Sequence, residues 1–250
     1  KAQNDSLESA MVDLLLEVYD KRLEYFPGKE DYVLGLKAVD MMKYKRGTNQ
    51  EIYDLFTKAL EIGGQEQSAA FYNGLFAASA RLFNEKVFSI EDVFNAYAVV
   101  VEGIEVNNNS LNKTIAELSA KSEDTTSSDL TAKERLLGKS KRELVRYEKV
   151  ESNAQKIIGK IATCDRLQTI YNDESFEANK TDIVWLKRAS KMLLKEREDE
   201  NGEESDCSDN PTFFKIAEAL YKLEPSISAA RAMGKLAYTK AEYSKSLKYF

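Results

Sequence analysis

The chain has 250 residues, of which 43% are hydrophobic and 31% charged, so it can bury a core and is not a disordered polymer. Three prolines and eleven glycines are few, which excludes a turn-rich sheet protein and favours long helices. The net charge of −6 without a basic stripe argues against a nucleic-acid partner, and no uncharged apolar run is long enough to span a membrane.

The N-terminal part predicts a series of amphipathic helices. The first covers residues 7–26 and is ended by Pro27-Gly28. We expect it to carry one broad apolar face, formed by Met11, Leu14, Leu15, Val18, Leu23 and Phe26. Two further helices are expected, beginning near residue 31 and near residue 52.

The next two predicted helices are apolar on most sides. One covers residues 69–83, and the other begins at Ser89 with Asp92 as a capping acid. Because helices of this kind are packed on both sides, we expect the pair to form the core of the N-terminal half.

The middle of the chain is less regular. The run Asn107-Asn108-Asn109 predicts a break, followed by a short helix, and residues 119–128 predict an exposed loop. Thr131 and Glu134 fit a capping box that opens one long helix reaching residue 162.

The C-terminal part predicts shorter helices, starting at Cys164, with residues 195–206 as an acidic loop. Asn210-Pro211 is expected to start a helix with proline in its first turn, and Pro225 lies where that helix must end. After it, small residues allow two helices to cross closely: Ala230, Gly234 and Ala237. We expect larger side chains of the second of these helices to fill the groove: Tyr243, Leu247 and Phe250.

Recurring helix pairs of this length predict an all-α fold, an α-solenoid of antiparallel helix pairs. We divide it into divergent helical repeats (1–106), a loop and long bridging helix (107–163), and a C-terminal repeat region (164–250). Because a solenoid end normally carries a polar cap, we expect the native chain to continue past Phe250.

Residues of the last unit resemble the tetratricopeptide repeat: Ala219-Leu220, Leu223-Glu224-Pro225, Ala230, Gly234, Ala237, Tyr243 and Leu247. A wider set resembles the secreted tetratricopeptide-repeat proteins of Bacteroidetes: Tyr25-Phe26, Tyr32 to Gly35, Cys164-Asp165, Phe176 to Asn179, Cys207 and Ala219 to Ser226. The resemblance implies a right-handed superhelix and a location in the periplasm or at the surface of a bacterium. A signal peptide is then expected to have been removed, since residue 1 is Lys.

The resemblance also implies a binding position. In the repeat family, an Asn placed as Asn73 is in Phe71-Tyr72-Asn73 faces the concave groove and holds a peptide backbone. Tyr72 and Lys37 are candidates for the same partner-binding surface. The alternative is that Asn73 bonds only to a neighbouring loop.

Cys164 and Cys207 are the only cysteines, and three states are open to them: a disulfide, two buried thiols or a reactive thiol. Neither lies in an obviously buried pattern, and no thiolate-activating group is near in sequence. In an oxidising compartment the sequence favours the disulfide.

The sequence predicts a non-enzymatic scaffold that binds a protein or peptide in a concave groove at the cell envelope. Histidine is absent, which removes the commonest general base and most zinc sites, and no cofactor or metal site is predicted. Carboxylate pairs such as Glu203-Glu204 have no apolar setting that would raise a pKa. The alternative is a glycan- or nutrient-binding accessory protein of an outer-membrane uptake system.

Overall fold

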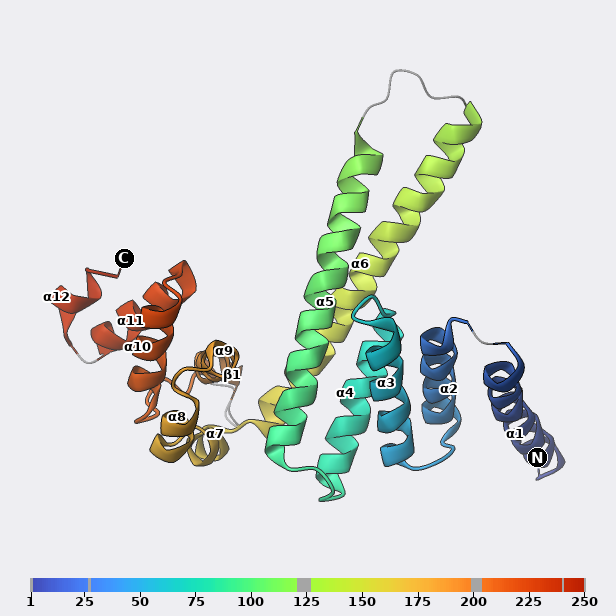
Figure 1. The fold of residues 1–250 in the computed structure, drawn as a ribbon, viewed down its shortest axis with the longest axis horizontal. Helices are drawn as coiled ribbons and strands as arrows, with labels where there is room; N and C mark the ends of the chain where they lie inside the picture. Colours follow the sequence, from blue (N-terminus) through green and yellow to red (C-terminus); the bar gives the residue numbers. More distant parts are fainter. Residues whose placement is uncertain (1, 27, 121–126, 199–203, 240, 250) are drawn as a thin grey trace. The chain divides into compact units, whose positions relative to one another are not determined.

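The computed structural model (Figure 1) describes residues 2–26, 28–120, 127–198, 204–239 and 241–249. The regular secondary structure of these residues is helical apart from one short two-stranded ribbon, so the predicted all-α class is confirmed. The chain forms two compact units, Lys1–Ile157 and Ile158–Phe250, and each is described by itself.

In the first unit, helices α1 to α5 pack on one another in chain order, so that α1 lies at one end of this row (Figure 1). They are α1 (Ala2–Tyr25), α2 (Glu30–Tyr44), α3 (Asn49–Gly63), α4 (Ala69–Asn84), α5 (Ile90–Ser119) and α6 (Ser127–Ile161), whose last turn falls in the second unit. The predicted capping pair at the start of α5 is confirmed, since the side chains of Ser89 and Asp92 each accept a bond from the other's backbone N–H.

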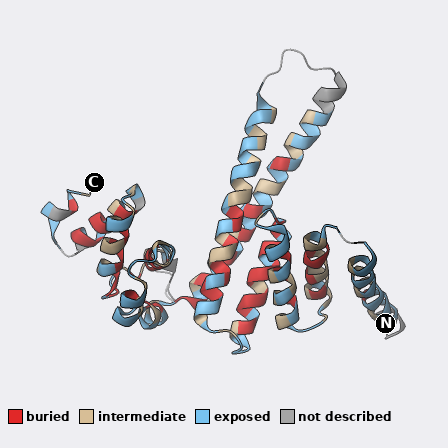
Figure 2. Ribbon diagram, in the orientation of Figure 1, coloured by how far each residue is buried: buried red, intermediate tan, exposed pale blue. Residues whose placement is uncertain are grey.

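The core of the first unit lies around α4 and α5, as the sequence predicts. Buried residues occur on nearly every side of α4, and Figure 2 shows them continuing into the first half of α5. Phe56 of α3 and Phe71 of α4 meet edge to face, with ring centroids 5.0 Å apart. Gly74 allows this packing, because a Cβ there would overlap the Phe56 ring.

The turn between α3 and α4 has its backbone carbonyl groups bonded by side chains from three helices. The Tyr72 hydroxyl (α4) donates to the Gln65 carbonyl at 2.5 Å, and the Asn107 amide (α5) donates to the same oxygen at 2.7 Å. The Tyr147 hydroxyl (α6) donates to the Gln67 carbonyl at 2.5 Å, across 80 positions of sequence. These bonds satisfy carbonyl groups that are partly or fully buried, and they join the turn to α4, α5 and α6.

The predicted break at Asn107 to Asn109 is wrong, because α5 continues through it to Ser119. An asparagine inside a helix costs only about 0.7 kcal/mol relative to alanine. The Asn107 amide also donates to the Gly103 carbonyl at 2.7 Å, one turn back, besides its bond to Gln65. The proposed boundary at 106/107 therefore lies within a helix, and the two compact units meet at 157/158 instead.

The long predicted helix is confirmed as α6, but the capping box that was to open it is wrong. The helix already begins at Ser127, upstream of Thr131. Most of the predicted loop before it, residues 121–126, lies outside the described residues.

The second unit holds shorter elements: α7 (Cys164–Ile170), α8 (Asp173–Asn179), α9 (Ile183–Leu193), β1 (Arg197–Glu198), β2 (Glu204–Ser205), α10 (Phe213–Leu223), α11 (Ile227–Thr239) and α12 (Tyr243–Ser246). The ends of the predicted acidic loop pair as an antiparallel ribbon, with Arg197 opposite Ser205. Residues 199–203 between them lie outside the described residues.

Of the two predictions made for prolines, the one for Pro211 is wrong and the one for Pro225 is confirmed. Pro211 is not in the first turn of a helix, because α10 begins at Phe213 after its N-cap Thr212. The Asn210 carboxamide oxygen instead accepts the Thr212 N–H at 2.8 Å, which makes a tight turn before the helix. Pro225 does follow the end of α10, as predicted.

The expected packing of the last helix is wrong in part. Tyr243 and Leu247 are 58% and 78% exposed and do not fill a groove, while Phe250 lies outside the described residues. Instead Ser246 is buried, and its hydroxyl donates to the Gly234 carbonyl at 2.8 Å. The reason is length: α12 has only 4 residues, too few to present a continuous apolar face.

Gly103→Ala is expected to destabilise the first unit, because a Cβ at that position would overlap the buried Tyr72 ring. Overpacking of this kind costs about 1–3 kcal/mol, which exceeds the usual gain of replacing a helical glycine. Urea denaturation followed by circular dichroism measures the change. The control is Gly138→Ala in α6, where the added Cβ would meet only the Arg142 side chain at 3.5 Å. Equal stability of the two variants would contradict the packing described here.

Tyr147→Phe is expected to change the alkaline stability of the chain. Burial, with a smaller effect of the Glu143 charge, raises the pKa of Tyr147 to about 12 in the folded state. The unfolded phenol titrates near about 10. The stabilisation is therefore complete below the unfolded pKa and is lost as pH rises through the folded pKa.

Stability of the Tyr147→Phe variant should accordingly fall less steeply than that of the wild type between pH 10 and pH 12. At neutral pH the variant should be less stable by about 1 kcal/mol, because the Gln67 carbonyl loses its donor. Urea denaturation at a series of pH values measures both effects, with the exposed Tyr243→Phe as control. Parallel pH curves for wild type and Tyr147→Phe would refute the assignment.

Candidate protein-binding surface

The inner face of α1 is attached to α2 by apolar and polar contacts. Val12 is buried, and the Tyr19 hydroxyl donates to the Asp40 carboxylate at 2.6 Å. Arg46, just after α2, donates to the Asp13 carboxylate at 3.1 Å and to the Ser9 carbonyl at 3.3 Å. Burial, and then the bond to Asp40, raises the pKa of Tyr19 to about 12, so this hydroxyl keeps its proton at neutral pH.

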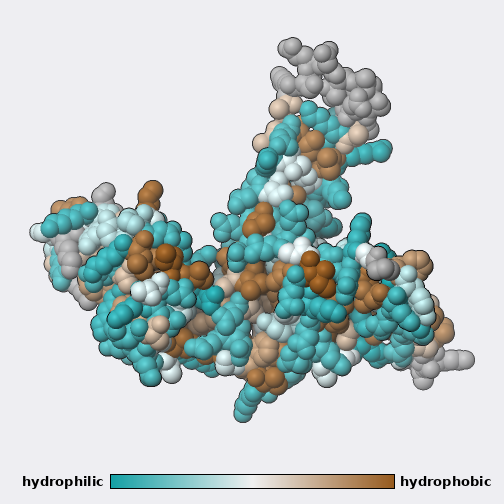
Figure 3. Space-filling model, viewed as in Figure 1, coloured by the Kyte–Doolittle hydropathy of each residue, from teal (hydrophilic) through white to brown (hydrophobic). Residues whose placement is uncertain are grey.

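The outer face of α1 is apolar and exposed. Its five side chains, here called the outer stripe, are Leu7 (62% exposed), Met11 (64%), Leu14 (60%), Val18 (54%) and Tyr25 (62%). They follow steps of four and three residues along the helix, with Lys21 occupying the position between Val18 and Tyr25. Brown, apolar atoms are visible among polar ones at the α1 end of the first unit in Figure 3.

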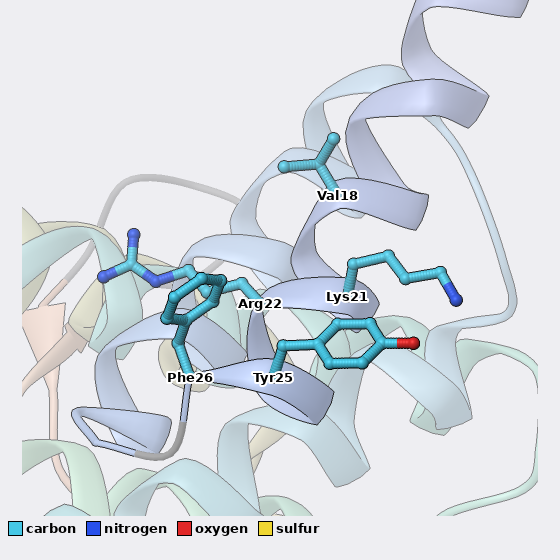
Figure 4. Close-up of a pocket in the computed structure, with 5 residues that line it drawn as sticks. All are labelled: Val18, Lys21, Arg22, Tyr25 and Phe26. Carbon is cyan, nitrogen blue, oxygen red and sulfur yellow. The ribbon is translucent and has the colours of Figure 1, made fainter.

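The C-terminal end of the outer stripe is hollowed. Figure 4 shows the hollow, which has a volume of about 510 Å³ and is lined by Val18, Lys21, Arg22, Tyr25 and Phe26. The Lys21 ammonium lies 5.6 Å from the centre of the Tyr25 ring. The wall is thus apolar at its base and cationic at its rim, which suits an apolar side chain flanked by acidic ones.

Most members of the predicted apolar face of the first helix are exposed. Met11, Leu14, Val18 and Phe26 are exposed, whereas Val12, which that face did not include, is buried. The helix has two apolar faces, and α2 covers one of them. The repeated four-three spacing from Leu7 to Val18 is the sequence signal that distinguishes the outer face.

The three predicted partner-binding residues do not form one surface. Tyr72 is fully buried and bonded to the Gln65 carbonyl, so its ring and hydroxyl are unavailable without unpacking α4. Asn73, the next residue of α4, is exposed. Lys37 is largely covered and pairs with the Asp20 carboxylate of α1, and it lines a separate hollow of about 340 Å³ between α2 and α3. Partner binding by Asn73 stays a prediction.

Cys164 and Cys207 are joined by a disulfide, with Cα atoms 5.3 Å apart. The expectation that neither cysteine is in the core is wrong for Cys207, which is 1% exposed. The Cys207 N–H donates to the Leu193 carbonyl at 2.9 Å. The neighbouring Asp206 carboxylate pairs with Lys235 of α11. The segment after β2 is therefore attached to α7, α9 and α11.

Within the described ranges, no helix is long and apolar enough to cross a membrane. The same residues contain no group of three or more cysteine, aspartate or glutamate side chains arranged to hold a metal ion. Comparison with known proteins finds no matching family, curated protein or solved structure.

Reduction of the disulfide is expected to destabilise the second unit. The bridge closes a loop with a sequence separation of 43, for which chain entropy predicts a loss of about 4 kcal/mol. Thermal unfolding with and without dithiothreitol measures the effect, and the Cys164→Ala/Cys207→Ala double variant is the control that should not respond. Two free thiols by non-reducing mass spectrometry of the native protein would show that the bridge is absent.

Proposed function

We propose that this chain is a non-enzymatic protein-binding scaffold of the cell envelope, and that it docks a helical segment of a partner on the outer stripe of α1. The observation that carries the proposal is the stripe itself, five large apolar side chains that are each more than half exposed. Contiguous exposed apolar surface rimmed by charge is typical of a protein-interaction site. A stripe at helical spacing suits a helix as its counterpart.

The arrangement of α1 to α5 supports a repeat scaffold. Each of these helices packs on the next, as in an α-solenoid of antiparallel pairs, and the tetratricopeptide-like superhelix is part of this proposal. Among the described residues nothing covers the outer face of α1, although it is apolar, which favours its being covered by a partner.

The disulfide supports an envelope location, the periplasm or the surface of a bacterium. Disulfides persist in oxidising compartments and are rare in the cytosol.

Site-specific photo-crosslinking tests the proposal. A benzophenone amino acid at position 14 is expected to capture a protein in cells of the natural source, because Leu14 lies at the centre of the stripe. The matched control is position 87, since Val87 is equally exposed (59% against 60%) but lies between α4 and α5. Crosslinks at position 87 only, or at neither position, would overturn the proposal. A rise in melting temperature with oligosaccharides, unaffected by changes on α1, would favour the glycan-binding alternative.

A further inference from the structure

We infer that the partner on the outer stripe is a second copy of this chain, whose α1 packs antiparallel against the first. The inference rests on the proposed function, because it names the occupant of the same surface. It is argued from the spacing of the stripe, the shape of its hollow and the order of charges beside it.

The stripe has the spacing of a coiled-coil seam. Two helices wind around each other when apolar residues recur every 3.5 residues, in alternating steps of three and four. Leu7, Leu14 and Lys21 occupy one core position of this heptad, and Met11, Val18 and Tyr25 occupy the other. Packing against α2 requires only one apolar face of α1. It does not explain a second apolar seam that extends over three heptads.

The hollow of Figure 4 has the form of a coiled-coil hole. Each core side chain inserts between four residues of the facing helix. Val18, Lys21, Arg22 and Tyr25 stand at i, i+3, i+4 and i+7, and all four line the hollow. The side chain that fills it must be apolar, long and exposed, which describes Met11 of a second copy at 64% exposure.

One antiparallel register meets these requirements together. It places Met11 of the second copy beside Lys21, Leu14 beside Val18, and Leu7 beside Tyr25, and the two-fold axis repeats each pair. The Lys21 stem is long enough to lie along Met11 while its ammonium reaches water. A single charged residue in a seam of this kind selects the register of the pair.

The charges beside the seam complement each other in the same register. Glu8 and Arg22 are both exposed and lie on the same flank of the seam. Glu8 of each copy therefore faces Arg22 of the other copy. On the other flank the two Glu17 carboxylates face each other, and this one pair is repulsive. In a parallel pair, Arg22 would lie near Glu17 rather than Glu8, so the two orientations are distinguishable by charge exchange.

Sedimentation equilibrium of the full oxidised chain tests the inference. The wild type is expected to be a dimer that dissociates on dilution. Met11→Lys puts an ammonium against Lys21 and Arg22 of the second copy and should raise the dimer Kd by on the order of 100-fold. Met11→Leu should retain the dimer, and so should Val87→Lys, the matched exposed control. Circular dichroism confirms that each variant is folded.

Charge exchange tests the register. Glu8→Arg and Arg22→Glu should each weaken the dimer, and the double variant should restore it. A wild type that stays monomeric at the highest attainable concentration would overturn the inference, and a dimer that the double variant does not restore would overturn the antiparallel register.

The outcome separates the inference from the proposed function. If position 14 crosslinks to a different protein while the chain is monomeric, the scaffold function stands and self-association is refuted. If position 14 crosslinks to nothing and the chain is monomeric, both are refuted. A crosslink between two copies, lost in Met11→Lys, supports both.

Discussion

The turn between α3 and α4 has its carbonyl groups bonded by Tyr72, Asn107 and Tyr147, and the first unit depends on these bonds. A buried carbonyl left without a donor costs about 1–3 kcal/mol. The three donors come from α4, α5 and α6, so these bonds join the turn to all three helices. Apolar packing alone would hold the helices together, but it would tolerate sliding that these directional bonds do not.

The tightly packed core of the first unit offers no accessible binding surface, so the candidate site lies on α1 at the end of the row. The Tyr72 hydroxyl is bonded to the turn, and the Tyr72 ring packs against Gly103. The face of α4 that contains Tyr72 is therefore not available to a partner. At the end of the row, Tyr19 and Arg46 fix α1 to α2 through charged and neutral hydrogen bonds. The inner face of α1 is thereby held in one orientation, which presents the outer stripe to the surroundings without further ordering. Preorganisation of this kind lowers the entropic cost of binding.

The second unit is held together differently. Its helices are short and bury apolar residues such as Leu193, Phe213 and Met233. The covalent link of Cys164 to Cys207 and the pairing of Asp206 with Lys235 add connections between its elements. Burial opposes ionisation of Asp206, but bonds from Lys235 and Ser208 outweigh it and lower the pKa of this carboxyl. The segment between β2 and α10 is thus attached to helices through Asp206 and Cys207.

Apolar periodicity and capping residues such as Ser89 and Asp92 locate most of the helices, because these signals act locally. The sequence also identified α4 and α5 as central, since a helix that is apolar on most sides has to be covered on most sides. Local signals failed where a distant partner decides the outcome. Three asparagines predicted a break, yet α5 continues through them, and the Asn107 amide donates to the Gly103 carbonyl and to the α3–α4 turn.

Only the tertiary structure decided which of the two apolar faces of α1 is buried. Periodicity locates a face on a helix, but it does not tell whether a neighbour exists to cover it. Met11 and Val12 are adjacent in sequence and differ in exposure from 64% to 6%, because α2 lies on one side of the helix and solvent on the other. The four-three spacing marks the residues of the candidate binding surface, but its exposure depends on which side of α1 the neighbouring helix occupies.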